Sequence, residues 1–190
     1  MPLDETKRRL RDTVRARRRA AHEAGGSAAA QALVAAFERA ITVPPDAVVS
    51  GYWPAGSELD VRPLLERLHA GGHLLVLPVV TARDASLGFR VWQPGDPLIK
   101  SDAPGCRPRV RPDMTPTCCW CRCSASTARA PGSARGPAIT TAPCCGCVPT
   151  RAVTAIGIGY AVQELPSIPT GPYDQPLDAV LTEAGLIEID

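Results

Sequence analysis

Seven of the eight cysteines in this chain fall between residues 115 and 150, in the stretch TPTCCWCRCSASTARAPGSARGPAITTAPCCGCVPT. Within it, CCWCRC and CCGC contain the C-x-C and C-x-x-C spacings found in zinc sites, where four thiolates hold the ion. Adjacent cysteines cannot easily turn both sulfurs toward one ion, and no knuckle-like glycine or apolar spacing surrounds them. A zinc-binding module is therefore one alternative, although the spacing argues against it.

The second candidate is the basic segment KRRLRDTVRARRR at residues 7–19. Its side chains could neutralise the phosphates of a nucleic acid, form a solvated helix surface, or clamp the phosphates of a nucleotide. The cations surround the predicted helix instead of forming one stripe, and no aromatic residue lies among them to stack on bases. A nucleic-acid-binding protein is therefore a second alternative, beside the two other interpretations.

A third candidate is YWPAGSELD at residues 52–60, which follows a predicted strand and opens a helix. In an open α/β sheet, ligands bind beyond the carboxyl ends of the strands. Glu58 could accept hydrogen bonds from the amino groups of a substrate while Trp53 or Tyr52 packs on a flat ring. Equally, Glu58 could be a first-turn carboxylate that the helix dipole favours.

Two aspartates near the C-terminus are the last candidates. Asp174 and Asp178 lie in LPSIPTGPYDQPLDAVLTEAG, a segment rich in proline. A carboxylate there could bind a hard cation such as Mg²⁺. Capping of a neighbouring element is the commoner role for such an aspartate.

The elements that would position these residues alternate between strand and helix. Two continuous apolar runs, LLVLPVV and AVTAIGIGY, are typical of parallel strands buried on both faces. The alternation predicts an α/β fold with a largely parallel sheet. The predicted helices are a basic one ending at Gly25-Gly26, one starting at Ser27, and 59–70, capped by Ser57; the predicted strands are 47–53, 74–80, 88–94, 152–160 and a short pair within 177–189.

Residues 101–150 break this alternation, because they are rich in Pro, Ser, Thr, Gly, Ala and Cys and carry almost no periodic apolar signal. A long irregular insert is uncommon inside a compact domain, which makes this segment anomalous. The sequence therefore predicts no regular elements there.

Bulk properties select few partners. The formal net charge is +2, and no stretch approaches the roughly 20 apolar residues that cross a bilayer. The N-terminus turns basic without the apolar region of a signal peptide. We therefore expect a cytoplasmic monomer with no membrane or nucleic-acid partner, in a compartment where disulfides rarely persist.

The order and spacing of several motifs resemble those of the 5-formyltetrahydrofolate cyclo-ligase family, also called methenyltetrahydrofolate synthetase. The family opens with a K-R-x-L-R helix, continues with a loop bearing E-[LIV]-D/E, and then shows a G-x-x-L-x-L-P strand. The resemblance covers about residues 1–114 and 151–190. The matching blocks are KRRLR (7–11), PAGSELDVRPLL (54–65), GHLLVLPVV (72–80), LGFRVWQPGDPL (87–98) and AIGIGYAVQELPSIPTGPYDQPLDAVLTEAG (155–185).

The resemblance implies a three-layer α/β fold, in which helices flank a mostly parallel sheet within a single domain over residues 1–190. It also implies a ligase that forms a C–N bond in one-carbon folate metabolism. ATP phosphorylates the formyl oxygen of 5-formyltetrahydrofolate, N10 attacks the activated carbon, and phosphate leaves to give 5,10-methenyltetrahydrofolate.

For the nucleotide, the resemblance implies that Lys7, Arg8 and Arg11 bind ATP. Their cations would stabilise the phosphoryl group as it moves. Asp174 is the implied magnesium ligand, since octahedral Mg²⁺ usually takes one or two carboxylates together with phosphates and water.

For the folate, the resemblance implies that Glu58 orients the substrate by accepting hydrogen bonds and that Trp53 flanks it. Gln163 would reach the site from the loop after AIGIGY. Trp92 either packs against the pterin or belongs to the strand core, and we favour the core.

One block of the family pattern is missing: a strand L-L-V-P-L-L-A-F-D followed by R-L-G-x-G-x-G-Y-Y-D, the glycine-rich loop that cradles ATP phosphates. Reading the codons one base out of frame recovers it. Residues 117–124 become L-L-V-P-L-L, where Val is forced because Trp120 has a single codon. Residues 131–150 become R-L-G-A-G-P-G-Y-Y-D-R-A-L-L-R-L-R-A-D, where Tyr-Tyr-Asp is permitted and not forced.

We therefore interpret residues 115–150 as a frameshifted segment with compensating base changes at each end, which replaces the phosphate loop. Its cysteines are leucine codons misread by one base. Since the printed chain lacks the phosphate loop, we expect it to bind ATP poorly and to turn over slowly or not at all.

Overall fold

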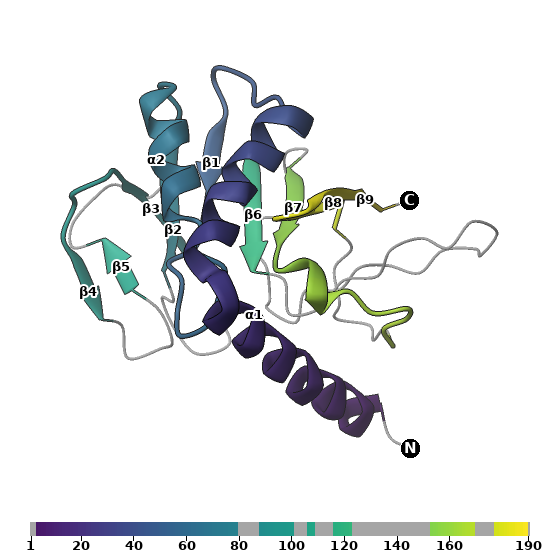
Figure 1. The fold of residues 1–190 in the computed structure, drawn as a ribbon. Coiled ribbons are helices and arrows are strands. Elements are labelled where there is room, and N and C mark those ends of the chain that lie inside the picture. Colours follow the sequence, from purple (N-terminus) through teal and green to yellow (C-terminus); the bar gives the residue numbers. More distant parts are fainter. Residues whose placement is uncertain are drawn as a thin grey trace.

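A computed structural model describes the chain over residues 3–79, 88–100, 106–108, 116–122, 153–169 and 177–189. The strands are β1 (Val48–Ser50), β2 (Leu74–Val79), β3 (Gly88–Trp92), β4 (Leu98–Lys100), β5 (Cys106–Pro108), β6 (Cys118–Arg122), β7 (Thr154–Ile158), β8 (Ala179–Thr182) and β9 (Gly185–Glu188). A seven-stranded sheet has the order β3-β2-β1-β6-β7-β8-β9, and β4 pairs with β5 apart from it. Figure 1 shows this sheet behind the long first helix.

The inner strands of the sheet run parallel. The pairs β2–β1, β1–β6, β6–β7 and β7–β8 are parallel, whereas β3 and β9 are antiparallel strands at the two edges. The predicted α/β fold is confirmed. The short strand pair predicted within 177–189 is also confirmed, because β8 and β9 form it.

The first helix, α1 (Leu3–Ala40), is broken at one glycine. Gly25 has φ 172° and ψ 45°, outside helical geometry, and Figure 1 shows α1 changing direction along its length. Glycine is the residue that weakens a helix interior most after proline. The predicted break at Gly25-Gly26 is confirmed, although the chain continues into the second helical half without an intervening loop.

The second helix, α2 (Arg62–Ala70), begins later than predicted. Val61 is its N-cap residue, and the Arg62 N–H donates to Asp60 Oδ1 at 3.0 Å. The prediction that Ser57 caps this helix is wrong, because the intervening residues form a turn instead. The predicted end is confirmed: Gly71 is the C-cap residue, and Gly72 takes φ +88°, which favours glycine.

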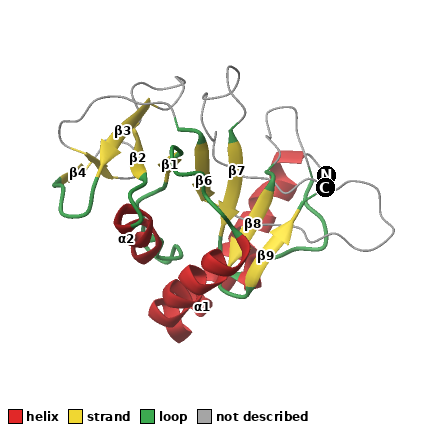
Figure 2. Cartoon of the chain, turned by 90° about the horizontal axis from the view of Figure 1, so that it is seen from above, coloured by secondary structure: helices red, strands yellow, loops and turns green. Residues whose placement is uncertain are grey.

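In Figure 2, α2 and the C-terminal half of α1 lie on one side of the row of strands, and the rest of α1 runs beneath β8 and β9 toward the N-terminus. Their apolar side chains meet those of the sheet in one core, which includes Leu33 of α1, Leu65 of α2 and Ile158 of β7. Val76 and Val180 are also buried, and Val180 belongs to a separate apolar cluster. Burial of strand residues outside the main core is what a second covering layer would produce. The predicted third layer nevertheless stays a prediction, because within the described residues both helices pack against the same face of the sheet.

Regular structure also exists where the sequence predicts none. β5 and β6 both fall within residues 101–150, so that prediction is wrong for these two segments. β6 lies in the middle of the sheet between β1 and β7. Thr117 anchors its start, since its N–H donates to the Val48 carbonyl at 3.0 Å and its Oγ1 accepts from the Val48 N–H at 2.9 Å. Backbone pairing, and not side-chain periodicity, places this strand.

Candidate functional site

The candidate site lies where three parallel strands end. Because β1, β6 and β7 are parallel neighbours, their carboxyl ends meet at one edge of the sheet, which is where open α/β sheets bind ligands. In Figure 1 the N-terminal half of α1 continues past this edge. The chain leaving β1, the chain leaving β7 and one face of α1 therefore supply the side chains of the site.

The segment after β1 forms a tight turn that fixes Glu58. The Glu58 N–H donates to the Ala55 carbonyl at 3.3 Å, and the Ala55 N–H donates back to Glu58 Oε2 at 2.9 Å. Gly56 takes φ +59° inside this turn, a conformation that residues with a Cβ rarely adopt. Tyr52, buried after β1, donates its hydroxyl to the Leu59 carbonyl at 2.8 Å and so pins the other end of the loop.

Arg18 of α1 joins this turn from across the site. Its Nε–H donates to Ser57 Oγ at 3.1 Å, and its Nη1 lies 3.6 Å from Glu58 Oε1. The side chains of Arg18 and Glu58 are 19% and 7% exposed. A buried carboxylate needs a partner of this kind, because desolvation without one is costly.

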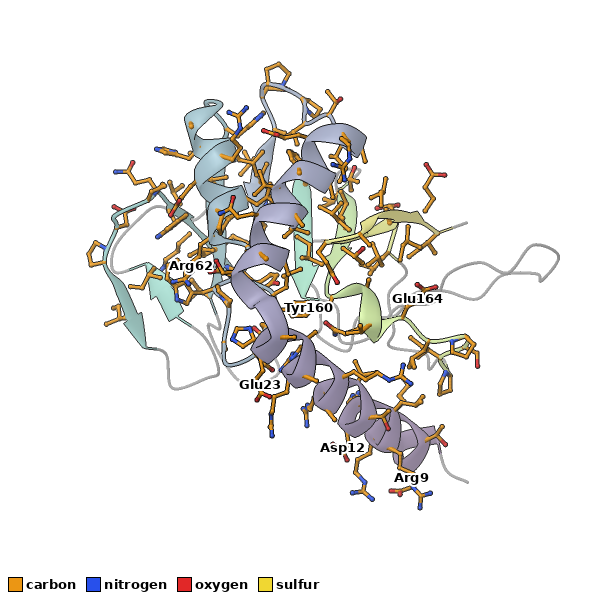
Figure 3. All side chains as sticks on the ribbon, viewed as in Figure 1. Arg9, Asp12, Glu23, Arg62, Tyr160 and Glu164 are labelled. Carbon is orange, nitrogen blue, oxygen red and sulfur yellow. The ribbon has the colours of Figure 1, made fainter. Side chains whose placement is uncertain are left out.

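The segment after β7 meets the same helix one turn further on. His22 Nδ1 is hydrogen-bonded to the Tyr160 hydroxyl at 3.2 Å. The Tyr160 N–H donates to Gln163 Oε1 at 2.9 Å, which closes the short helix η1 (Ala161–Gln163). The Ala161 N–H donates to Glu183 Oε2 at 2.9 Å, so the turn after β8 also supports this corner. Figure 3 shows Tyr160 beside α1 near its bend.

The pKa values of two groups reflect this clustering. Burial raises the pKa of the Tyr160 hydroxyl above its ordinary value, and the nearby charge of Glu183 acts in the same direction. Burial also raises the pKa of the Asp60 carboxyl, but the hydrogen bonds and charge of Arg62, with a smaller part from His22, outweigh it and hold that pKa below its ordinary value. Charges from α1, β1 and β7 therefore act on one another here.

Two tryptophans and an arginine flank the turn. The Arg62 guanidinium donates to both oxygens of Asp60, at 2.8 and 2.7 Å, and lies 5.6 Å from the centre of the Trp53 ring. Trp53 meets Trp92 edge-on, with ring centroids 5.7 Å apart. Trp92 is buried in the core, as we favoured, and its Nε1–H has no hydrogen-bond partner in the described structure. One face of the half-buried Trp53 is thus already occupied by a cation.

The three cations predicted to bind ATP do not all lie on one face of α1. Lys7 and Arg11 are half-buried, on the same face of α1 as buried Val14, because the spacings of four and seven residues bring side chains onto one face. Arg8 is exposed and donates to both oxygens of Glu5, at 3.0 and 2.9 Å. Lys7 and Arg11 thus share a face with Arg18, and Arg8 does not.

Asp174, the predicted magnesium ligand, lies outside the described residues. Asp178 caps backbone, the commoner alternative: its Oδ2 accepts from the Ala155 N–H at 2.6 Å and its own N–H donates to the Ala155 carbonyl at 2.9 Å. Among the residues that the structure covers, no group of three or more His, Cys, Asp or Glu side chains could hold a metal ion. Most of the cysteine-rich segment, residues 123–150, also lies outside them.

Sequence reasoning missed three residues of the site. Arg18 was hidden among seven other basic residues in segment 7–19 and His22 stood alone, yet their spacing of four places them on one helix face. Tyr160 closes the buried run AIGIGY, directly beyond a strand end, where a ligand-facing side chain is expected. Its position beyond the carboxyl end of a strand could have identified Tyr160 as a candidate. Arg18 and His22 could be identified only once the topology showed which strand ends α1 crosses.

The fold and the site define an open α/β protein with a polar, carboxylate-bearing edge at the ends of its parallel strands. In structure the chain is similar to 5,10-methenyltetrahydrofolate synthetase from Aquifex aeolicus, with a TM-score of 0.69, 16% identity, and 96% of this chain and 92% of that chain covered. A 5,10-methenyltetrahydrofolate synthetase from Mycoplasma pneumoniae matches with a TM-score of 0.69, 17% identity, and 93% and 98% covered. The resemblance that the motifs predict is confirmed at the level of the fold.

No protein-family model and no curated protein sequence matches the chain. Within the described part of the chain, no helix is both long and apolar enough to span a bilayer.

Proposed function

We propose that this chain derives from an ATP-dependent 5-formyltetrahydrofolate cyclo-ligase and that residues 115–150 impair the printed form. The observation that carries the proposal is the buried, turn-fixed Glu58 at the carboxyl edge of a sheet that shares its fold with 5,10-methenyltetrahydrofolate synthetase structures. The reaction closes a ring by forming a C–N bond, with ADP and phosphate released. We expect a single-domain, cytoplasmic monomer acting on a small folate.

The folate side of the site is supported by the chemistry of its side chains. Glu58 offers carboxylate oxygens in a nearly water-free setting, where hydrogen bonds from ring N–H and amino groups of a flat heterocycle are strongest. Trp53 supplies an adjacent aromatic surface, and its free edge or face can flank the ring. Gln163 caps η1 beside Tyr160, so we assign it the role of shaping the pocket wall.

The nucleotide side is supported by the position of the basic residues. Lys7 and Arg11 lie on the face of α1 that also carries Arg18, and cations there would neutralise phosphate charge as the phosphoryl group moves. Arg8 is bonded to Glu5 and would have to leave that partner to join them. We therefore keep Lys7 and Arg11 as the leading ATP-binding residues.

Magnesium would accompany the nucleotide, as in other phosphoryl transfers. Asp174 is our proposed protein ligand, on the basis of the motif alone. The chemistry the ion supplies is charge neutralisation during phosphoryl transfer.

The test compares the printed chain with a chain in which residues 115–150 are translated one base out of frame. Each is assayed for ATP-dependent conversion of 5-formyltetrahydrofolate to 5,10-methenyltetrahydrofolate. We expect turnover by the shifted-frame chain and a rate lower by a factor of about 100 or more in the printed chain, since one lost oxyanion donor alone costs about that much. Sequencing the source gene across codons 110–152 decides which frame is real.

The two outcomes that matter are separate. A shifted-frame chain that folds but converts no folate would overturn the proposed activity. Equal turnover by the two chains would leave the activity standing and refute the impairment. Glu58→Gln in the shifted-frame chain is the control, and it should lose substrate affinity without losing its fold.

A further inference from the structure

We propose that Arg18 is a positioning residue for folate binding, which acts by holding Glu58 in its substrate-accepting orientation. The inference rests on the proposed function and deepens it, because it names a side chain outside the motifs on which the family resemblance rests. It is carried by the contacts among Arg18, Ser57 and Glu58.

The contacts around Glu58 fix the orientation of its carboxylate. Oε2 already accepts from the Ala55 N–H at 2.9 Å, so the turn fixes one oxygen. Oε1 lies 3.6 Å from Arg18 Nη1, close enough for an ion pair but long for a hydrogen bond. A carboxylate has about four acceptor positions and can therefore take several donors at once.

Arg18 is itself held in place from a second direction. Its Nε–H donates to Ser57 Oγ, the neighbour of Glu58, at 3.1 Å. A guanidinium that bonds one residue through Nε and faces the next through Nη1 has little rotational freedom. The cation therefore fixes the turn as well as the carboxylate, and both contacts reach across the site from α1.

The charges facing Glu58 single out Arg18. Arg17 and Arg19, its neighbours on α1, are exposed, whereas Arg18 is the one whose side chain is largely buried against the turn. The other contact from α1, His22 to Tyr160, lies one helical turn away and belongs to the segment after β7. Together these two contacts tie α1 to the strand ends on both sides of β6.

The helix face that carries Arg18 also carries the proposed ATP-binding cations. Lys7, Arg11 and Arg18 are spaced by four and seven residues, so they follow one another along α1. If Lys7 and Arg11 contact the phosphates, then α1 both binds the nucleotide and orients Glu58, the carboxylate that accepts hydrogen bonds from the folate. Loss of Arg18 should then affect folate binding and leave nucleotide binding to Lys7 and Arg11.

The experiment measures 5-formyltetrahydrofolate binding to the full printed chain by isothermal titration calorimetry, which requires neither ATP nor turnover. Arg18→Met should weaken binding by about tenfold or more, the usual scale when one partner of a buried charge pair is removed. Arg18→Lys should recover part of the affinity. The matched control is Arg19→Met, which removes the same charge one residue along and should bind like the parent chain.

A double-mutant cycle separates positioning from direct contact and from a structural role. Arg18→Met should cause no further loss in a Glu58→Gln background, because Arg18 acts through that carboxylate. Arg18→Met should lower the thermal unfolding midpoint below that of Arg19→Met, because the buried Glu58 loses its ion-pair partner, and Arg18→Lys should restore part of both the midpoint and the affinity.

Each other outcome has a distinct meaning. Additive losses in the double variant would overturn positioning and indicate direct contact with the ligand. Loss of the folded state in Arg18→Met at the titration temperature, without recovery in Arg18→Lys, would reduce Arg18 to a structural residue. Parent-like binding by Arg18→Met refutes this inference alone. Failure of the printed parent chain to bind folate also overturns this inference, and the shifted-frame assay then decides the proposed activity separately.

Discussion

β2 and β6 occupy equivalent places on either side of β1, yet their sequences differ sharply. β2 reads LLVLPV and β6 reads CCWCR. Both pair in parallel with β1, and β6 is also paired with β7 on its other edge. An inner parallel strand is buried on both faces and normally consists of Val, Ile and Leu. The position of β6 is therefore one that Val, Ile and Leu normally occupy, and the printed strand contains none of them.

The frameshift interpretation predicts a more apolar strand at this inner position. Reading residues 117–124 one base out of frame yields L-L-V-P-L-L, which is the composition that this inner position favours. Cys118 is 8% exposed and lies in the main apolar core with Val49 and Ile156. Its buried side chain contributes to the packing of that core.

The largest expected change in the free energy of unfolding is in β2, whose sequence fits its position in the sheet. Leu77→Ala in β2 removes a side chain that is 1% exposed and should lower the free energy of unfolding by about 2–5 kcal/mol. Leu74→Ala in the same strand is the control, because Leu74 is 39% exposed and should change that free energy by less than about 1 kcal/mol. Urea titration of both variants measures the pair, and similar losses would show that β2 does not occupy the core as described.

A substitution toward leucine in β6 should change the free energy of unfolding by a smaller amount and in the opposite direction. Cys118→Leu adds apolar volume where the shifted frame places leucine, and should raise the free energy of unfolding by about 1 kcal/mol. Cys118→Ser should lower it, since the hydroxyl would need a buried partner. The same urea titration measures both. Destabilisation by leucine would mean that the site is already filled, as overpacking typically costs about 1–3 kcal/mol, and would count against the frameshift interpretation.

The smallest effect concerns the loop after β1, where charge supplements packing. The pKa of Asp60 is depressed in the folded chain, so its ion pair with Arg62 contributes stability above the unfolded pKa of about 3.9 and loses it as pH falls through the folded value. Because Arg62 is half exposed, Asp60→Asn should cost at most about 1 kcal/mol at pH 7. Unfolding curves at pH 7, 5 and 3 test this; a cost that persists unchanged at pH 3 would assign it to the amide and not to the charge.

Much of the fold could be predicted because its signals are local. The continuous apolar run at 74–80 and the run at 152–160 became β2 and β7, and Gly25 and Gly71-Gly72 ended helical segments where expected. Glu58 was a candidate from its place beyond a strand. Each of these follows from side-chain periodicity, backbone freedom or position within a few neighbouring residues.

What the sequence by itself determined is therefore the identity of the elements, the resemblance of the motifs and the anomaly at 115–150. Only the tertiary structure decided that β6 lies at the centre of the sheet and that Arg18 and His22 reach Ser57 and Tyr160. Those last contacts join residues 39 and 138 positions apart. No local pattern encodes such pairs, because they depend on the order in which the strands assemble and on the direction in which α1 crosses their ends.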